Sequence, residues 1–247
     1  MIRMLPRVAA LLLLSTLAVG ADAPGKPEAT IRAKLAAAMP GAEITSVAPS
    51  PIAGVYEVVL DGSETAFVSA DGLHLISGDL YQAMPGKGLV NVTEQRKGGL
   101  RKDVLAKLAP GDMINFTAKG KEKGAVYVFT DPDCGYCRKL HQEVPQLNAA
   151  GVTVHYLAFP RSGLEGETFR QMTAVWCALD RNKALTDSKR GVSLPAASLA
   201  CRAPVAEQYK LGVSMGVRGT PAIFLVDGTQ IGGYMPAAEL INKVVKR

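Results

Sequence analysis

The chain has 247 residues, of which 48% are hydrophobic and 20% charged, and it carries a net charge of +6. These values are typical of a soluble globular protein with one large or two modest domains, and they exclude a disordered or collagen-like chain. Two basic residues, Arg3 and Arg7, lie in a segment that we expect to be removed, which leaves a charge of +4 and no long basic run. We therefore expect no nucleic-acid partner.

Residues 1–21 have the order of a secretory signal peptide. A short basic start precedes an almost wholly apolar stretch at Val8–Val19, and small residues follow at Gly20 and Ala21. The stretch is shorter than the about 20 residues that a membrane span needs, although an uncleaved anchor helix stays open as the alternative. Export places the four cysteines in an oxidising compartment, and we expect no membrane insertion after cleavage.

Residues 22–83 predict a small α+β domain. A helix is expected over residues 27–39, with Ile31 and Leu35 on its apolar face and a Pro-Gly pair at its end. Short runs of β-forming residues follow, and Asp-Gly turns between them predict an antiparallel sheet. These runs are Ile44–Val47, Val55–Leu60, Thr65–Ser69 and Leu73–Ser77. Because the edges of so small a sheet need cover, we expect the domain to dimerise.

Residues 84–110 are interpreted as a linker that contains one helix. Proline and glycine interrupt the pattern at residues 84–88, and Arg96-Lys97-Gly98-Gly99 interrupts it again. Leu100–Leu108 then shows helical spacing, closed by a Pro-Gly pair. We interpret the basic side chains of this segment, Arg101 among them, as the solvated face of the helix.

Residues 111–247 predict an α/β domain built on a βαβ unit. Ala125–Thr130 predicts a buried strand, Cys137–Asn148 a helix kinked at its proline, and Val152–Phe159 a second strand. A mostly helical stretch is expected over residues 164–211. The chain then predicts a third strand and a closing amphipathic helix, at Ala222–Val226 and Pro236–Val245.

The motif Cys134-Gly135-Tyr136-Cys137 lies where the first strand of this unit turns into its helix. A thiol at a helix N-terminus faces unpaired N–H groups and the positive end of the helix dipole, which favour the thiolate. The thiolate attacks disulfides, and a second thiol one turn later can close an intramolecular disulfide. We hypothesise that Cys134 is the exposed nucleophile and Cys137 the more buried resolving thiol.

Two other uses of this cysteine pair stay open, and a third is excluded. A zinc site would need a second half, and Cys177 and Cys201 lack the spacing for one, although His141 could be a third ligand. We interpret His141 instead as a helix-surface residue. Covalent haem attachment needs His after the second cysteine, where this chain has Arg138. The last alternative is a purely structural disulfide. We expect neither a metal nor a cofactor.

Cys177 and Cys201 are the two remaining cysteines, and in an exported protein we expect them to pair with each other. On chain-entropy grounds, closing that loop contributes about 3–4 kcal/mol. A second redox-active pair is the alternative.

Gly219-Thr220-Pro221 precedes the last predicted strand. Because proline cannot donate to a sheet ladder, Pro221 must lie at a strand start or edge. We predict a cis Thr220–Pro221 bond beside Cys134, where the Thr220 backbone could pair with an extended substrate. A trans loop proline is the alternative.

Several of these segments together resemble one family. Val128–His141 resembles the active-site segment of the bacterial periplasmic disulfide isomerases of the DsbC/DsbG family. Trp176-Cys177-Ala178 with Cys201 is similar to its structural-disulfide region, Leu211–Ala222 to its cis-proline loop and Asp71–Leu80 to its dimerisation hairpin. The match covers nearly the whole chain after the signal segment, in the right order.

The resemblance implies a thioredoxin-fold catalytic domain with a helical insertion at about residues 162–212, and a cystatin-like N-terminal domain that forms a V-shaped homodimer. It implies Cys134 as nucleophile, Cys137 as its partner and a structural Cys177–Cys201 bridge. The remaining site residues that it implies are Tyr136, Thr220 and cis Pro221 for substrate, and Leu75, Ile76 and Gly78 for the dimer interface.

The resemblance also implies a periplasmic enzyme that rearranges wrong disulfides in misfolded exported proteins. A membrane-embedded thiol reductase of the DsbD type would keep it reduced. Asp131 and Asp133 depart from the family pattern, and two carboxylates so near Cys134 would oppose thiolate formation. Two rival functions stay open: a reductase of sulfenylated protein thiols, and a dimeric holdase chaperone whose cysteines are incidental.

Overall fold

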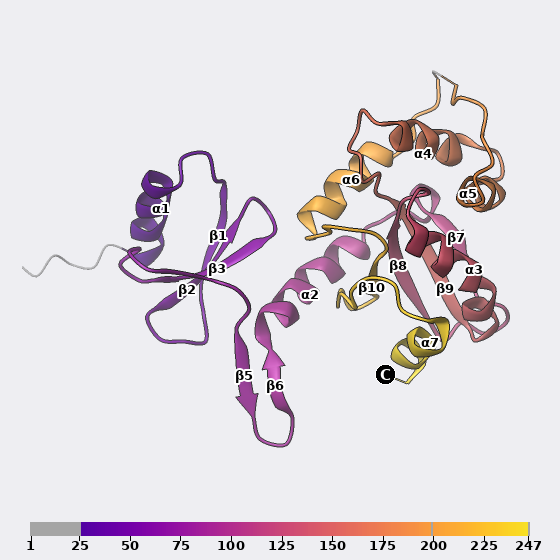
Figure 1. Cartoon of the computed structure of the whole chain (residues 1–247). Coiled ribbons are helices and arrows are strands. Elements are labelled where there is room, and N and C mark those ends of the chain that lie inside the picture. The colour runs from indigo at the N-terminus through magenta and orange to yellow at the C-terminus, as the bar shows by residue number, and fades with distance from the viewer. Residues whose placement is uncertain (1–25, 199, 247) are drawn as a thin grey trace, which may run out of the picture.

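The computed structural model describes residues 26–198 and 200–246, so the expected signal segment lies outside the described residues. The first part of the fold is a helix packed on a four-stranded antiparallel sheet of order β1-β2-β3-β4 (Figure 1). Its elements are α1 (Pro27–Ala38), β1 (Ile44–Pro49), β2 (Val55–Leu60), β3 (Glu64–Ser69) and β4 (Leu75–Ser77). Ile31 and Leu35 of α1 fill a small core against Val58 and Val68 of the sheet, as their spacing predicts.

The linker differs from the sequence prediction in two ways. Residues 81–91 form an unpredicted hairpin, in which β5 (Tyr81–Met84) pairs with β6 (Gly88–Asn91). Helix α2 (Val92–Leu105) also starts earlier than expected and runs through the two glycines that were interpreted as a break. Packing overrides their low helix propensity. The two segments pack so closely that a Cβ atom at position 228 would lie 2.0 Å from the Gly98 carbonyl oxygen.

The second part contains a four-stranded sheet of order β10-β8-β9-β7. The predicted βαβ unit is present: β8 (Gly124–Thr130) and β9 (Val152–Ala158) are parallel, with α3 (Gly135–Ala149) between them. The edge strands β7 (Ile114–Phe116) and β10 (Ala222–Leu225) run antiparallel to their neighbours. The other helices are η1 (Pro110–Asp112), α4 (Glu167–Cys177), α5 (Arg181–Lys189), α6 (Val205–Ser214) and α7 (Ala237–Val245).

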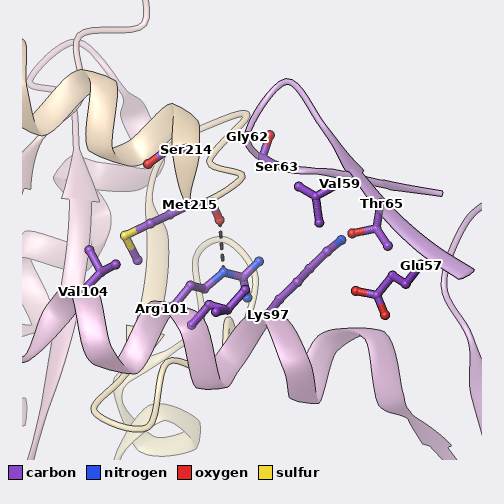
Figure 2. A pocket seen from close by; sticks show the side chains of 11 residues that line it. Glu57, Val59, Gly62, Ser63, Thr65, Lys97, Arg101, Val104, Ser214 and Met215 are labelled. Atoms are coloured by element: carbon purple, nitrogen blue, oxygen red, sulfur yellow. Dashed lines mark hydrogen bonds between the residues drawn. The ribbon is translucent and has the colours of Figure 1, made fainter. Parts of the chain in front are cut away.

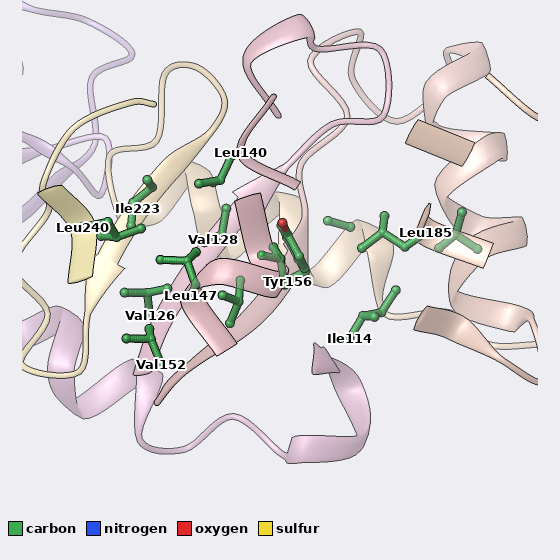
Figure 3. Close-up of a cluster of buried hydrophobic side chains, with 14 of the residues drawn as sticks. Ile114, Val126, Val128, Leu140, Leu147, Val152, Tyr156, Leu185, Ile223 and Leu240 are labelled. Atoms are coloured by element: carbon green, nitrogen blue, oxygen red, sulfur yellow. The ribbon is translucent and has the colours of Figure 1, made fainter. Parts of the chain in front are cut away.

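Successive side chains of the central strand β8 point to opposite faces of this sheet, and each face has its own hydrophobic core. Val126 and Val128 belong to the larger cluster, which Leu140 of α3 and Leu240 of α7 complete (Figure 3). Phe129 belongs to the opposite cluster, which receives residues from α2 and β10. Because both faces are covered, the strand reads as a continuous apolar run rather than an alternating one.

Helix α2 contacts both parts of the chain, and Arg101 is buried where it meets the second part. Its Nε donates to the Met215 carbonyl at 3.0 Å (Figure 2). Its Nη1 donates to the Glu94 carboxylate at 2.6 Å, and the guanidinium lies 5.3 Å from the centroid of the Phe224 ring. The interpretation of this basic segment as a solvated face is therefore wrong for Arg101, because its side of α2 faces the second sheet.

We expect Arg101→Met to lower the free energy of unfolding by about 2–4 kcal/mol, because it leaves buried acceptors without their charged donor. Urea denaturation followed by circular dichroism measures this. Lys102→Met is the control, since Lys102 is exposed on the same helix, and it should change stability by less than about 0.5 kcal/mol. Equal stabilities of the two variants would contradict the role given to Arg101.

Candidate active site

Cys134 is the N-cap residue of α3, so its sulfur lies at the start of the helix. The Cys134 sulfur accepts a hydrogen bond from the Cys137 N–H at 3.4 Å, and the thiol donates to the Thr220 carbonyl at 3.1 Å. Both Cys134 and Cys137 are free thiols. The expectation that Cys134 is exposed is wrong, since it is only 4% exposed. It is covered because the Thr220–Pro221 segment packs against it.

The Thr220–Pro221 bond is cis, as the sequence analysis predicts. An open groove runs beside this peptide, lined by Arg218, Gly219, Thr220, Pro221, Gln230 and Gly232. Tyr136, between the two thiols in sequence, is 64% exposed and stacks on Tyr234 with 5.8 Å between ring centroids. The site thus combines covered sulfurs with an accessible groove and an aromatic pair.

The two carboxylates before Cys134 are both paired with arginine. Asp131 is buried, and its Oδ2 accepts hydrogen bonds from the backbone N–H of Arg161 at 2.8 Å and from its Nε at 3.2 Å. Asp133 contacts Arg138 at 3.3 Å. The expected opposition to the thiolate is therefore offset by these positive charges.

The two thiols differ in acidity. Burial raises the pKa of Cys134, but the Thr220 side chain, the Cys137 N–H and the charge of Arg161 all favour the thiolate and leave that pKa below its ordinary value. Burial dominates at Cys137, which is 1% exposed, and its pKa stays raised although the charge of Lys189 opposes the shift. Cys134 is therefore the thiol that ionises first.

His141 is buried rather than on the helix surface, so that interpretation is wrong. Its Nδ1 is 3.1 Å from the Tyr156 hydroxyl and its Nε2 is 3.0 Å from Thr186 Oγ1, because this face of α3 packs against β9 and α5. Burial lowers the pKa of His141 to about 3, with the charges of Lys189 and Arg190 adding to the effect. A neutral, doubly hydrogen-bonded imidazole is a structural residue here.

Cys177 and Cys201 form a disulfide, as expected, with 6.1 Å between their Cα atoms. Bonded to each other, they cannot supply thiolates to a zinc site. Among residues 26–198 and 200–246, no group of three His, Cys, Asp or Glu is placed to hold a metal ion. Within the same residues, no helix is both long and apolar enough to cross a membrane.

The structure adds four residues to the site that sequence reasoning missed: Thr130, Arg161, Lys189 and Tyr234. Thr130 and Arg161 had a usable signal, because Thr130 ends β8 and Arg161 follows the end of β9 by three residues, and functional residues gather beyond the carboxyl ends of parallel strands in α/β sheets. Lys189 has only a spacing of four from the buried Leu185, and Tyr234 follows a Gly-Gly turn with no pattern of its own.

Comparison with known proteins places both parts of the chain. Residues 22–94 match the N-terminal domain of disulfide bond isomerase proteins, and residues 111–246 match a thioredoxin-like domain. The thiol:disulfide interchange protein DsbC of Escherichia coli K12 is 40% identical over 81% of this chain and 80% of its own length. The Salmonella typhimurium protein of the same name is 41% identical over 86% and 85%.

A solved structure also shares the fold. The crystal structure of the thiol-disulfide exchange protein alpha-DsbA2 from Wolbachia pipientis matches 63% of this chain and 96% of its own, with a TM-score of 0.50 and 15% identity.

We expect Arg161→Met to raise the pKa of Cys134, since it removes a positive charge and leaves the buried Asp131 carboxylate without its partner. The rate of iodoacetamide alkylation of Cys134 at pH 7 should fall about threefold, which corresponds to half a pKa unit. The measurement is made in a Cys137→Ala background, so that only one active-site thiol reacts. Arg170→Met, on the exposed side of α4, should leave the rate unchanged. A pKa that does not move would refute the electrostatic role of Arg161.

Proposed function

The chain belongs to the DsbC-type family of thiol:disulfide interchange proteins, and we propose that Cys134 and Cys137 are the dithiol through which it acts. It is a disulfide isomerase and oxidoreductase of the thioredoxin fold. One observation carries the assignment to these cysteines: the Cys134 sulfur is held at the start of α3 against the Thr220 carbonyl, with a lowered pKa.

The reaction begins with both cysteines reduced. The Cys134 thiolate attacks one sulfur of a wrong disulfide; that S–S bond breaks, and the other substrate sulfur leaves as a thiolate. The freed thiolate can then attack a different disulfide in the substrate, which isomerises it. Alternatively, Cys137 attacks Cys134, releases the substrate reduced and leaves an oxidised enzyme. The N–H groups at the start of α3 stabilise the negative charge on Cys134 whenever it departs.

Substrate binding is proposed at Thr220, Pro221 and Tyr136. The groove beside the cis peptide is open, and an extended chain placed there would pair with the Thr220 backbone as an added strand. The stacked pair of Tyr136 and Tyr234 offers an exposed aromatic surface on the other side of the motif. Backbone pairing and apolar contact suit unfolded substrates, because neither depends on one particular sequence.

We propose a homodimer built on the edge strand β4. Among the described residues β4 pairs with β3 alone, its Leu75 and Ile76 are exposed, and Gly78 directly follows the strand. An exposed apolar edge strand is a template for pairing with a second copy. Two catalytic parts joined in this way would enclose a cleft able to hold misfolded, disulfide-containing proteins.

The proposed compartment is the periplasm, reached by means of the signal segment at residues 1–21. A thiol that must react while reduced needs a source of electrons in that oxidising compartment. We propose that a membrane-embedded thiol reductase of the DsbD type supplies them by reducing the Cys134–Cys137 disulfide.

Replacing each active-site cysteine should separate their roles. Cys137→Ala should accumulate mixed disulfides with substrate, because resolution is lost, whereas Cys134→Ala should lose at least 99% of the recovery of scrambled ribonuclease. Non-reducing electrophoresis and ribonuclease activity measure these outcomes, with reduced and oxidised wild-type protein as references. Equal and mild defects in both variants would contradict the assignment. A double variant that still suppressed aggregation would reveal a separate holdase activity.

Changing the edge strand tests the dimer. Ile76→Asp should convert the protein to a monomer, because it places a charge at the centre of the proposed strand pairing, and sedimentation velocity measures the mass. Leu179→Asp is the control, since Leu179 is also an exposed aliphatic residue but lies in the catalytic part. An Ile76→Asp protein that sediments like the wild type would rule out this interface.

A further inference from the structure

Lys189 is a buried cation that the mechanism above does not use. It is the last residue of α5, and it is only 4% exposed. Its Nζ donates a hydrogen bond to Thr130 Oγ1 at 2.7 Å and lies 5.5 Å from the centroid of the Tyr156 ring. None of the ion pairs within the described part of the chain includes Lys189. A buried ammonium without a carboxylate partner is costly, so its position calls for a reason.

Thr130 connects Lys189 to the resolving cysteine. Thr130 is the last residue of β8 and is fully buried, and its side chain acts to lower the pKa of Cys137. An ammonium group can only donate, so the Thr130 oxygen must accept from Lys189. The Thr130 proton is then free to point at the Cys137 sulfur. The ammonium, the hydroxyl and the Cys137 thiol therefore belong to one buried cluster.

We propose that Lys189 is a positioning residue for the resolving step: its charge orients the Thr130 hydroxyl toward Cys137 and stabilises the Cys137 thiolate. This inference rests on the roles proposed above for the two cysteines, and it adds a residue from the helical insertion to the dithiol chemistry. The proposal also explains why a cation is buried here: its anionic partner is the Cys137 thiolate, which forms during turnover.

The charges around Lys189 agree with this role. Burial lowers the pKa of Lys189 to about 8, while Cys137, Asp131 and Cys134 act to raise it and Arg138 acts to lower it. Below pH 8 the amine is therefore mostly protonated, which is the form the proposal requires. Of the other titratable neighbours, His141 and Tyr156 carry no charge at neutral pH, because burial lowers the pKa of His141 and raises that of Tyr156. Arg190 and Arg161 are also nearby and add positive charge, which favours a thiolate in the same sense as Lys189.

The step itself balances without any further reactant. Cys137 first loses its proton to solvent, and Lys189 stays protonated. The Cys137 thiolate attacks the Cys134 sulfur of the mixed disulfide; the Cys137–Cys134 bond forms as the bond from Cys134 to substrate breaks. The substrate sulfur takes the electron pair and a proton from water. The enzyme loses two electrons and the substrate gains them.

The test follows the lifetime of the mixed disulfide with glutathione. Reduced protein reacts with excess oxidised glutathione at a series of pH values between 6 and 9.5, and samples are quenched with acid over time. Intact-mass analysis then separates formation of the mixed disulfide at Cys134 from its resolution by Cys137. Lys189→Met should slow resolution about tenfold at pH 7, as expected for a rise of one unit in the pKa of Cys137. The pH profile of the resolution rate should shift to higher pH in this variant, so that resolution approaches the wild-type rate at pH 9.5. The rate at which the mixed disulfide forms should change less than threefold.

Matched variants separate positioning from packing. Thr130→Val keeps the shape and removes the hydroxyl, so resolution should slow in the same direction; Thr130→Ser should keep the wild-type rate. Lys183→Met, which removes an exposed lysine of the same helix, should change nothing. Because methionine fills a buried site without a desolvation cost, we expect Lys189→Met to fold. Should it not fold, the contrast between Val and Ser at position 130 decides the question.

Two failures have different meanings. A folded Lys189→Met protein that resolves the mixed disulfide at the wild-type rate across the whole pH range would overturn the inference about Lys189, as would equal rates for Thr130→Val and Thr130→Ser. If the wild-type protein itself forms no mixed disulfide at Cys134, the proposed roles of the cysteines fail instead.

Discussion

The contact between the Cys134 sulfur and the Thr220 carbonyl is the interaction on which the rest of the site depends. The two residues are 86 positions apart, and the sheet brings them together. β10 pairs with β8 so that Ala222 lies opposite Phe129, which places the residues before β10 next to the residues after β8. A shift of one residue in this register would turn the apolar side chains of β10 to the other face of the sheet. The packing of the core therefore also fixes the geometry of the thiol.

The acidity of the two thiols follows from what surrounds each of them. Both are buried, and burial alone would raise both pKa values. The pKa of Cys134 is nevertheless lowered, because the N–H group at the helix start, the Thr220 side chain and the charge of Arg161 all favour the thiolate. Cys137 lies deeper, where Lys189 only partly offsets desolvation. Environments that push two neighbouring groups apart in pKa assign them different chemical tasks. This difference agrees with the proposed mechanism, in which Cys134 attacks first and Cys137 acts after the mixed disulfide has formed.

Local sequence signals predicted most of the elements and the position of the motif. The Asp-Gly turns, the apolar run at 125–130 and the cysteines at the start of a helix depend only on neighbouring residues. The errors occur where a distant segment decides the outcome. Cys134 was expected to be exposed because nothing near it in sequence covers it. Asp131 was expected to oppose the thiolate because its partner, Arg161, comes from the end of another strand.

The same limit explains the helical errors. The glycine pair within α2 disfavours a helix by propensity, yet the pair is helical, and Gly98 packs closely against the segment around Gly228. His141 and Lys189 have polar identities that predict exposure, yet α3, α5 and β9 meet around them. Each hydrogen bond there joins elements that no local pattern connects. A polar residue at an apolar spacing, such as Lys189 after Leu185, is therefore worth noting before a structure is available.

The loop that carries Thr220 is also tied to the N-terminal part of the molecule. Arg101 of α2 binds the Met215 carbonyl at the start of this loop, and Arg218 contacts Glu64 of β3 at 2.6 Å. The second pair is exposed and contributes about 0–1 kcal/mol, whereas the buried Arg101 contacts hold α2 in place. The segment opposite Cys134 is thus positioned from both sides: by the catalytic sheet through β10, and by the linker helix through Arg101. A movement of α2 relative to the catalytic sheet would reach the sulfur through Met215 and the five residues that follow it, which connects the geometry of the dimerising part to the chemistry of the thiol.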